Sequence, residues 1–181
     1  MRPSRIIVGE VRGSEAIDML QSLNTGHCGA STGHSNSPKD MLSRIETMVL
    51  TGMEIPISAV QRQIASGIDI IVQLGRLRDK SRKVLQIVEV LGYEDGEIKL
   101  QTLYEFHEEQ VVDGKIKGEW VKVNEIQHFN LRTLVEETRR TEKTGLRGRT
   151  LAKSFFSICI FFTPCFVVVV CVILRVSFSN S

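Results

Sequence analysis

An apolar run near the amino terminus, Arg5-Ile6-Ile7-Val8-Gly9-Glu10, narrows the choice of fold more than any other part of the sequence. Its apolar residues are consecutive and do not alternate with polar ones, which is typical of a strand covered on both faces in a parallel α/β sheet. Ligands of such sheets bind beyond the carboxyl ends of the strands, where Glu10 stands. A carboxylate there can orient a water molecule for attack on a γ-phosphate, or hold Mg²⁺ through its water shell. The alternative is that Glu10 only caps the strand or pairs with Arg12.

A glycine- and histidine-rich segment follows, and we expect it to be a loop: Thr25-Gly26-His27-Cys28-Gly29-Ala30-Ser31-Thr32-Gly33-His34-Ser35-Asn36. Its glycines permit backbone conformations that are closed to other residues. An imidazole can donate a hydrogen bond to a phosphate oxygen, although for either histidine alone a packed or solvated side chain is the alternative. A zinc site of His27, Cys28 and His34 is disfavoured, because adjacent ligands are awkward and no fourth ligand or C-x-x-C pair is evident.

Two segments carry a resemblance to a known family. Residues Arg5 to Ala16 resemble the Walker B strand, and Ser31 to Ser37 the His box, of the secretion ATPases of type II, type IV pilus and type IV secretion systems. The similarity is strongest to the Flp/Tad pilus assembly branch and extends, more loosely, to about Phe129. It implies a partial RecA-like P-loop ATPase domain, with a parallel sheet and flanking helices.

The resemblance also implies the chemistry. ATP and Mg²⁺ would be the nucleotide and the metal ion, with Glu10 as the catalytic glutamate and His34 facing the γ-phosphate. His27, Arg12 and Glu15 would support nucleotide binding. We expect no direct metal ligand, since Glu10 would contact Mg²⁺ indirectly at most. The acid and the imidazole are expected to converge on one triphosphate pocket.

Family members carry an amino-terminal domain, a Walker A loop and an Asp box before Walker B, and no G-x-x-x-x-G-K-[ST] loop occurs in this sequence. We therefore expect a carboxy-terminal fragment, from a split gene, an internal start or a decayed gene, with essentially no ATP turnover alone. The resemblance implies a homo-hexamer or full-length ATPase subunits as partners, together with inner-membrane secretion or pilus platform proteins, at the cytoplasmic face of the bacterial inner membrane. A second hypothesis is a membrane-tethered, non-catalytic subunit that packs against full-length ATPases.

Local patterns predict further elements after the Walker B strand. Ser14 should cap a helix that ends near Gly26, and Ser37-Pro38 should start a second helix that ends at Gly52. Pro56 should open a third helix, followed by a strand over Ile68–Leu74. Segments 83–90, 98–106 and 118–123 predict an antiparallel meander with turns at 94–96 and 113–114. The basic cluster between Arg76 and Lys83 is a solvated turn or, alternatively, a contact with a neighbouring subunit's nucleotide.

The carboxy-terminal part differs in composition from residues 1–129. A basic linker over 130–153 precedes an uncharged run from Ser154 to Leu174, close to the roughly 20 residues that a membrane-spanning helix needs. We predict a hydrophobic helix over 154–176 that anchors the chain with residues 1–153 in the cytoplasm, followed by a short tail over 177–181. As the origin of this segment, a shifted reading frame is favoured over a selected membrane anchor, because the composition changes abruptly where the resemblance ends, and the segment should behave as apolar in either case. Nucleic acid is not an expected partner, because no basic and aromatic stripe runs through residues 1–129.

Overall fold

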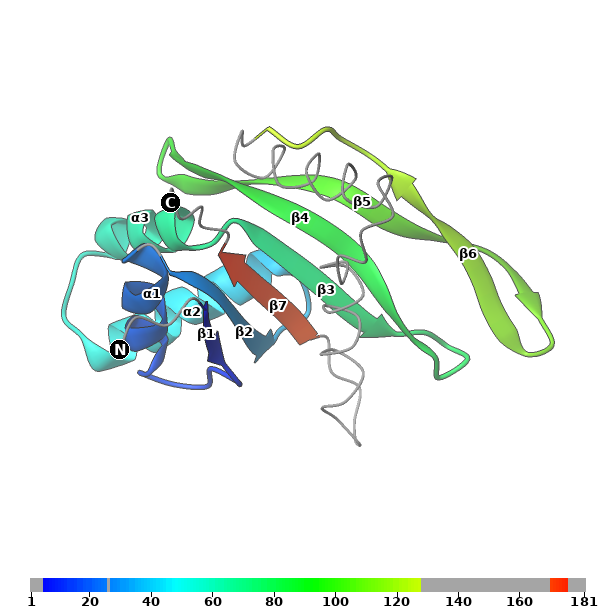
Figure 1. The fold of residues 1–181 in the computed structure, drawn as a ribbon, viewed down its shortest axis with the longest axis horizontal. Helices are drawn as coiled ribbons and strands as arrows, with labels where there is room; N and C mark the ends of the chain where they lie inside the picture. The colour runs from blue at the N-terminus through cyan, green and yellow to red at the C-terminus, as the bar shows by residue number, and fades with distance from the viewer. Residues whose placement is uncertain (1–4, 26, 128–169, 176–181) are drawn as a thin grey trace, which may run out of the picture. The chain divides into compact units, whose positions relative to one another are not determined.

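The structure, a computed structural model, describes residues 5–25, 27–127 and 170–175, and within them the chain has an α/β fold with one sheet (Figure 1). The helices are α1 (Ala16–Asn24), α2 (Pro38–Gly52) and α3 (Ile57–Gly67). The strands are β1 (Arg5–Val8), β2 (Cys28–His34), β3 (Ile70–Arg76), β4 (Arg82–Glu94), β5 (Glu97–Val112), β6 (Lys115–Lys122) and β7 (Val170–Arg175).

The described strands lie in the order β1-β2-β7-β3-β4-β5-β6. Strands β1 and β2 are parallel, and the other neighbouring pairs in this sheet are antiparallel. The predicted parallel arrangement is therefore seen only at the β1–β2 edge. The predicted antiparallel meander is confirmed in β4, β5 and β6. The prediction that the first strand is covered on both faces is wrong within the described residues, because β1 is an edge strand whose Ile7 is 65% exposed.

Strand β7 corrects the prediction of a carboxy-terminal hydrophobic helix. Residues 170–175 are a strand that pairs with β2 on one side and β3 on the other. Hydropathy cannot distinguish a buried strand from a helix in an apolar run, and the two open strand edges accept this segment's backbone hydrogen bonds. Residues 154–169 and the whole of the predicted linker over 130–153 lie outside the described residues. In the part of the chain that the structure describes, no helix is long and apolar enough to cross a membrane.

The compact unit that contains the sheet includes residues up to Glu125 and strand β7. Residues from Ile126 to Val167 group as a separate unit, of which only 126 and 127 are described. The predicted boundary near residue 129 therefore stays a prediction.

The helix ends follow local chemistry. The cap of α2 is confirmed, because Ser37 Oγ accepts a hydrogen bond from the backbone nitrogen of Asp40 at 3.1 Å and Pro38 occupies the first turn. The helix also ends at Gly52, as predicted. The cap predicted at Ser14 is wrong: Glu15 is the N-cap residue of α1 and makes no side-chain cap bond. Its carboxylate instead accepts from the backbone nitrogens of Arg12 and Gly13, so it stabilises the turn before the helix.

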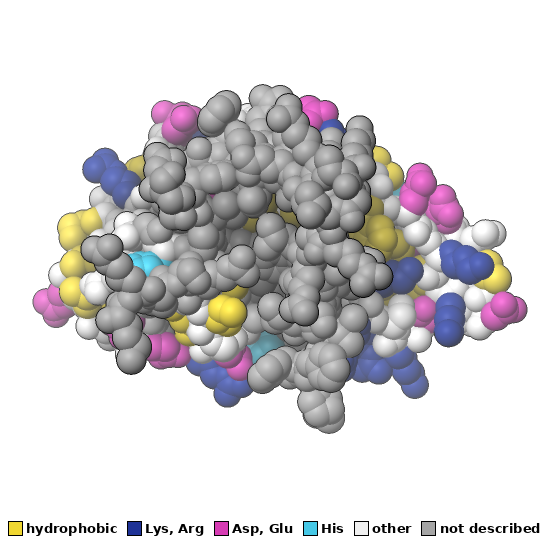
Figure 2. Space-filling view, viewed as in Figure 1, with side chains coloured by type: hydrophobic (Ala, Val, Ile, Leu, Met, Phe, Trp, Pro, Cys, Tyr) yellow, Lys and Arg dark blue, Asp and Glu magenta, His cyan; other side chains and the backbone are white. Residues whose placement is uncertain are grey.

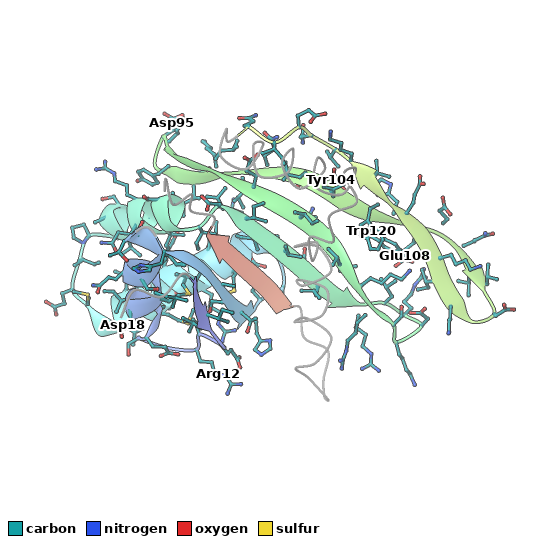
Figure 3. All side chains as sticks on the ribbon, viewed as in Figure 1. Arg12, Asp18, Asp95, Tyr104, Glu108 and Trp120 are labelled. Carbon is teal, nitrogen blue, oxygen red and sulfur yellow. The ribbon has the colours of Figure 1, made fainter. Side chains whose placement is uncertain are left out.

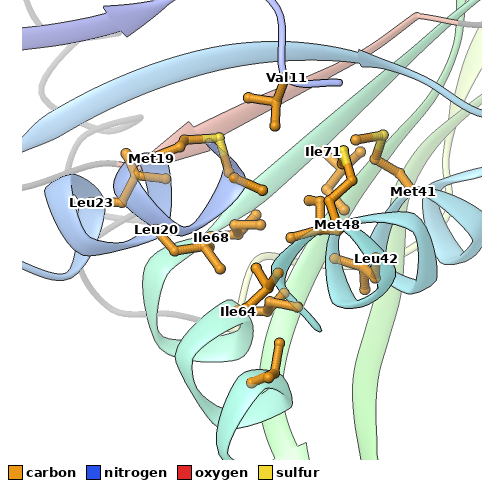
Figure 4. Packing of buried hydrophobic residues seen from close by; sticks show 14 of the residues in the cluster. Val11, Met19, Leu20, Leu23, Met41, Leu42, Met48, Ile64, Ile68 and Ile71 are labelled. Atoms are coloured by element: carbon orange, nitrogen blue, oxygen red, sulfur yellow. The ribbon is translucent and has the colours of Figure 1, made fainter. Parts of the chain in front are cut away.

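A hydrophobic core fills the space between the helices and the sheet (Figure 4). Each helix contributes a buried apolar stripe, and the sheet contributes Ile71 and Val90. The members buried on the helices are Ala16, Met19, Leu20, Leu23, Met41, Leu42, Ile45, Met48, Val49, Val60 and Ile64. Val11 also lies in this core, at 1% exposure, and fixes the chain just after β1.

The long hairpins are fixed by turns and by one carboxylate. Asp95-Gly96 and Asp113-Gly114 all have positive φ, the conformation that two-residue hairpin turns of type I′ need. Asp79, in the β3–β4 turn, accepts hydrogen bonds from the hydroxyl and the backbone nitrogen of Ser81 and from the backbone nitrogen of Ile116 in β6. These bonds, the Ser81 hydroxyl first, lower the pKa of Asp79 to about 2.

The basic cluster around Asp79 also makes intramolecular contacts. Arg78 pairs with Glu108 at 2.8 Å, and Lys83 donates to the carbonyl oxygen of Ile116 at 3.0 Å. Lys83 also lies over the Phe106 ring, 4.5 Å from its centroid. These contacts favour a structural role for the turn, which ties β6 to the β3–β4 hairpin.

Candidate functional site

The parallel pair of β1 and β2 sets the geometry of the site. Val8 is opposite Ser31, and the chain stays alongside β2 beyond the strand, because Val11 donates its backbone N–H to the carbonyl of Thr32 at 3.1 Å. The Thr32 hydroxyl donates to the carbonyl of Gly9. Both strands thus end at the same edge of the sheet, with Glu10 beside the end of β2.

The glycine- and histidine-rich segment is strand β2, which corrects the predicted loop. An ideal Cβ at Gly29 would lie 2.2 Å from Leu23 Cδ2, and one at Gly33 would lie 2.3 Å from Met41 Cε. The glycines therefore allow α1 and α2 to pack closely against the strand and supply no loop conformation. Their role is close packing, which a single sequence does not distinguish from turn formation.

Glu10 and His34 meet at the carboxyl ends of β1 and β2. The Glu10 Oε1 atom lies 2.8 Å from His34 Nε2, within hydrogen-bonding distance. The Glu10 Oε2 atom accepts a hydrogen bond from Arg12 at 2.6 Å. The two side chains are partly buried, with exposed fractions of 25% for Glu10 and 30% for His34, whereas Arg12 is 72% exposed. The structure thus brings together the acid and the imidazole that the sequence analysis paired.

The electrostatics favour an ionised Glu10. The hydrogen bond from Arg12 is the main reason that the pKa of Glu10 lies below its ordinary value, with further contributions from the charges of His34, Arg12 and Arg44. A carboxylate that stays ionised near neutral pH can accept a proton from, or orient, a water molecule. Among the described residues, His34 Nδ1 is buried and has no hydrogen-bond partner, so it could bond to a ligand atom.

Arg12 and Glu15 reach the site in different ways. Figure 3 shows Arg12 projecting from the end of the chain segment that follows β1. The Glu15 carboxylate is taken up by the turn, since it accepts from the Arg12 nitrogen at 2.7 Å and from the Gly13 nitrogen at 3.0 Å. The bond from the Arg12 backbone is the main cause that lowers the pKa of Glu15. Glu15 therefore holds the backbone of Arg12 in place, and in the described contacts it does not bond to Glu10 or His34.

His27 is not brought to this group. It precedes β2, whereas His34 ends the strand, so the two are separated by roughly 23 Å of extended chain. The Thr25 hydroxyl lies 3.0 Å from His27 Nδ1. The separation also means that His27 and His34 do not share one zinc ion. The described residues contain no group of three or more acidic, histidine or cysteine side chains placed to hold a metal ion.

Arg44, on α2, is a site residue that the sequence analysis did not single out. Its NH1 atom donates to the carbonyl oxygen of His34 at 2.6 Å and thereby ties α2 to the end of β2. Arg44 and Arg12 also line a groove of about 540 Å³ together with Gly13, Ser43, Thr47 and Met48. An arginine in an exposed helix position gives no signal in one sequence, because a solvated side chain is the default expectation there.

Charge is distributed differently at the far end of the sheet. In the space-filling view, side chains of both signs are interspersed over the end where β5 and β6 turn (Figure 2). Mixed charge of this kind is typical of a solvated surface and marks no ligand site. The β1–β2 edge therefore remains the candidate functional site.

Several known proteins resemble this chain over more than half of its length. Residues 1–152 match the model of the family described as type II/IV secretion system protein. A putative conjugal transfer protein of Mycobacterium tuberculosis is 38% identical over 106 residues, which cover 58% of this chain and 29% of that protein. The conjugal transfer protein TrbB of Rhizobium radiobacter is 33% identical over 113 residues, covering 62% and 34%. The type IV secretion system protein PtlH of Bordetella pertussis is 35% identical over 102 residues, covering 53% and 29%.

The chain therefore matches about a third of the length of these relatives. The family match itself covers most of the chain, and it includes all the residues of the site described above. This chain belongs to the type II/IV secretion system protein family, whose members are ATPases that act within multi-subunit secretion systems.

Proposed function

We propose that this chain supplies the water-activating part of the ATP site of a secretion or pilus-assembly ATPase. The observation that carries the proposal is the contact between Glu10 and His34, 2.8 Å apart at the carboxyl ends of two parallel strands. Ligands of parallel sheets bind at this edge. The shared edge, the ionised carboxylate and the unsatisfied imidazole nitrogen all suit a γ-phosphate and its attacking water.

Each residue has a separate task in this proposal. Glu10 orients the attacking water and receives its proton as the bond to phosphorus forms. In its imidazolium form, the only form in which both ring nitrogens donate, His34 donates from Nε2 to Glu10 and from Nδ1 to a γ-phosphate oxygen, which would satisfy the buried atom that lacks a partner among the described residues. Arg12 contributes positive charge beside the developing negative charge. His27 is not part of this arrangement, and Glu15 acts only through the turn that positions Arg12.

Mg²⁺ would neutralise charge on the β- and γ-phosphate oxygens when the nucleotide is bound. The residues present fit an indirect role toward it. Both oxygens of Glu10 already face cationic or hydrogen-bonding groups, Arg12 and His34, so the carboxylate would reach the ion through water.

The 181 residues do not contain a P-loop, the loop that would bind the phosphates of ATP. We infer that backbone amides and a lysine from outside these 181 residues complete the site. The 181 residues alone do not hydrolyse ATP. In the assembled enzyme, hydrolysis would take place in a homo-hexamer or beside full-length ATPase subunits, against platform proteins at the cytoplasmic face of the bacterial inner membrane. The Flp/Tad branch is the assignment we favour within the family. A membrane anchor over 154–176 is not part of the proposal, because Val170–Arg175 belongs to the sheet.

ATP turnover tests the proposal. The chain should show none alone and should recover turnover when mixed with a polypeptide that carries the P-loop half of a relative. Glu10→Gln should reduce the recovered rate by roughly a hundredfold or more, because general base catalysis is lost. Glu109→Gln, which removes an exposed carboxylate on β5, is the matched control and should leave the rate unchanged. Turnover by the chain alone, or recovery that survives Glu10→Gln, would contradict the proposal.

A mixture that forms a stable complex with full-length ATPase subunits but never recovers turnover would favour the second hypothesis, a non-catalytic subunit. The absence of a P-loop from the sequence is the observation that keeps this alternative open.

A further inference from the structure

The groove lined by Arg12 and Arg44 carries positive charge, and the same two arginines contact Glu10 and the backbone of His34. Arg12 lines it from the segment after β1, Arg44 and Ser43 line it from α2, and none of its lining residues is acidic. A guanidinium group has five N–H donors. In the described contacts Arg12 uses NH2 on Glu10, and Arg44 uses NH1 on the carbonyl of His34, so each has further donors to offer a ligand.

The two arginines differ in how firmly they are held. Arg44 extends from a four-turn helix and is tied to the end of β2 through the carbonyl of His34. Arg12 extends from a short segment, and its side chain is 72% exposed. Arg44 is thus a fixed point of positive charge, whereas Arg12 can change partner by rotating its own side chain.

The contacts of Glu10 show what such a change of partner would do. Its Oε1 atom is buried against His34, and its Oε2 atom is occupied by Arg12. A water molecule can therefore approach this carboxylate on the Oε2 side only after Arg12 has moved. As described, Arg12 covers one oxygen of Glu10 and the other oxygen is buried.

We propose that the groove binds a phosphate-type oxyanion between Arg12 and Arg44, and that the bound anion draws Arg12 away from Glu10 and exposes Oε2 to water. A phosphate group competes well for a guanidinium, because it offers more acceptor oxygens and more negative charge than one carboxylate. The anion stabilises the open arrangement because it contacts Arg12 only there, which is the condition for a ligand to shift an equilibrium.

The significance of the exposed oxygen rests on the proposed function, in which Glu10 is the base. The oxyanion site itself does not depend on the proposed function. Its ligand is either the terminal phosphate of a bound nucleotide or free phosphate, and the test below separates these two sources.

The experiment uses the complete chain with ¹³C and ¹⁵N labels, observed by NMR at the Glu10 carboxyl carbon and the arginine Nε–H groups. Inorganic phosphate, tripolyphosphate and ATP are the probes, added separately and without any P-loop partner. The variants are Arg12→Gln and Arg44→Gln. Arg78→Gln is the matched control, since Arg78 makes the same kind of ion pair, with Glu108 at 2.8 Å, outside the groove.

We expect the Glu10 carboxyl and Arg12 Nε–H signals of the wild-type chain to move together as anion is added. Arg12→Gln and Arg44→Gln should each raise the apparent Kd about tenfold, the loss of one charge-assisted contact, while Arg78→Gln binds as the wild type does. In Arg12→Gln the Glu10 signal should already lie, without anion, near its position in the anion-bound wild type. A response to phosphate alone identifies free phosphate as a ligand, and a response only to tripolyphosphate and ATP identifies the nucleotide's phosphate chain.

Two results would overturn the proposal. One is an anion response that Arg78→Gln weakens as much as Arg44→Gln does. The other is anion binding that leaves the Glu10 and Arg12 signals of the wild-type chain unmoved, a readout that needs no variant to fold. If the anion response holds but ATP turnover is never recovered with a P-loop partner, the proposed function fails and the oxyanion site stands.

Discussion

The Glu10 Oε1 and His34 Nε2 atoms lie 2.8 Å apart although their residues belong to different segments of the chain. The cause is the register of the parallel pair, in which Val8 is opposite Ser31 and the backbone of Val11 bonds to Thr32. Two residues that follow parallel strands in this register reach the same edge of the sheet together. The contact is therefore a product of strand pairing, and neither residue needs a long or flexible loop to make it.

Charge at this contact can be measured through the pKa of Glu10. In Arg12→Gln the pKa should rise toward its ordinary value, because the largest cause of its lowering, the Arg12 hydrogen bond, is removed. In His34→Gln it should rise by less, since His34 contributes only through its charge. A ¹³C titration of the Glu10 carboxyl group measures both shifts. A larger rise in His34→Gln than in Arg12→Gln would contradict this ranking.

Asp79 should make stability depend on pH in the acid range. Its pKa is about 2 in the folded chain, below its ordinary value of 3.8, so its stabilising contribution is fully present above about pH 4. As pH falls from 4 to 2 the carboxylate is protonated and the contribution is lost. Asp79→Asn should lower the free energy of unfolding at pH 7 and flatten its dependence on pH within this window, measured by urea unfolding. Glu109→Gln, on the exposed surface of β5, serves as the control and should keep the wild-type slope between pH 4 and 2.

Two glycines should tolerate a methyl group differently. A Cβ at Gly118 would lie 2.0 Å from the carbonyl oxygen of His107, a backbone atom that the β5–β6 pairing holds in place. A Cβ at Gly33 would meet the terminal methyl of Met41, which can rotate away. Gly118→Ala should therefore cost about 3 kcal/mol or more and Gly33→Ala closer to 1 kcal/mol, within the range for overpacked sites. Thermal unfolding checks the order, and equal losses would show that Met41 is as firmly held as the strand.

The N-cap of α2 should contribute measurably to the free energy of unfolding. Ser37→Ala removes the acceptor for the backbone N–H of Asp40 and should cost about 1 kcal/mol of unfolding free energy. Ser43→Ala, the same substitution inside the helix, should be neutral or slightly stabilising because alanine has the higher helix propensity. Chemical unfolding of both variants decides the matter. A loss in Ser43→Ala as large as in Ser37→Ala would mean that capping is not the cause.

Local patterns predicted the parts of the fold that depend on neighbours in sequence. The Ser37-Pro38 start and Gly52 end of α2 and the Asp-Gly turns of the hairpins lie where we expected them, because capping and turn chemistry act over three or four residues. The cap predicted at Ser14 is wrong because the neighbouring Glu15 accepts the hydrogen bonds of this turn, and the local pattern alone did not rank the two residues.

The nature of the two most ambiguous segments depended on their partners in space. The glycines of β2 indicated a loop until the positions of Leu23 and Met41 showed that a side chain at Gly29 or Gly33 would press on packed core atoms. The apolar residues 170–175 indicated a helix, but they lie between the open edges of β2 and β3, which no local pattern reveals. Arg44 joined the site for a similar reason, through a bond to the backbone of His34.

The sequence by itself therefore determined the family and singled out Glu10 and His34 through their resemblance to known motifs, and it determined the order of most elements through short-range chemistry. Tertiary structure alone decided that β1 is an exposed edge, that β7 joins β2 to β3, and that Arg44 reaches the backbone of His34. Those features depend on which strand edges and side chains meet after folding. Such tertiary contacts depend on packing across the whole chain, and no local or periodic sequence pattern predicts them.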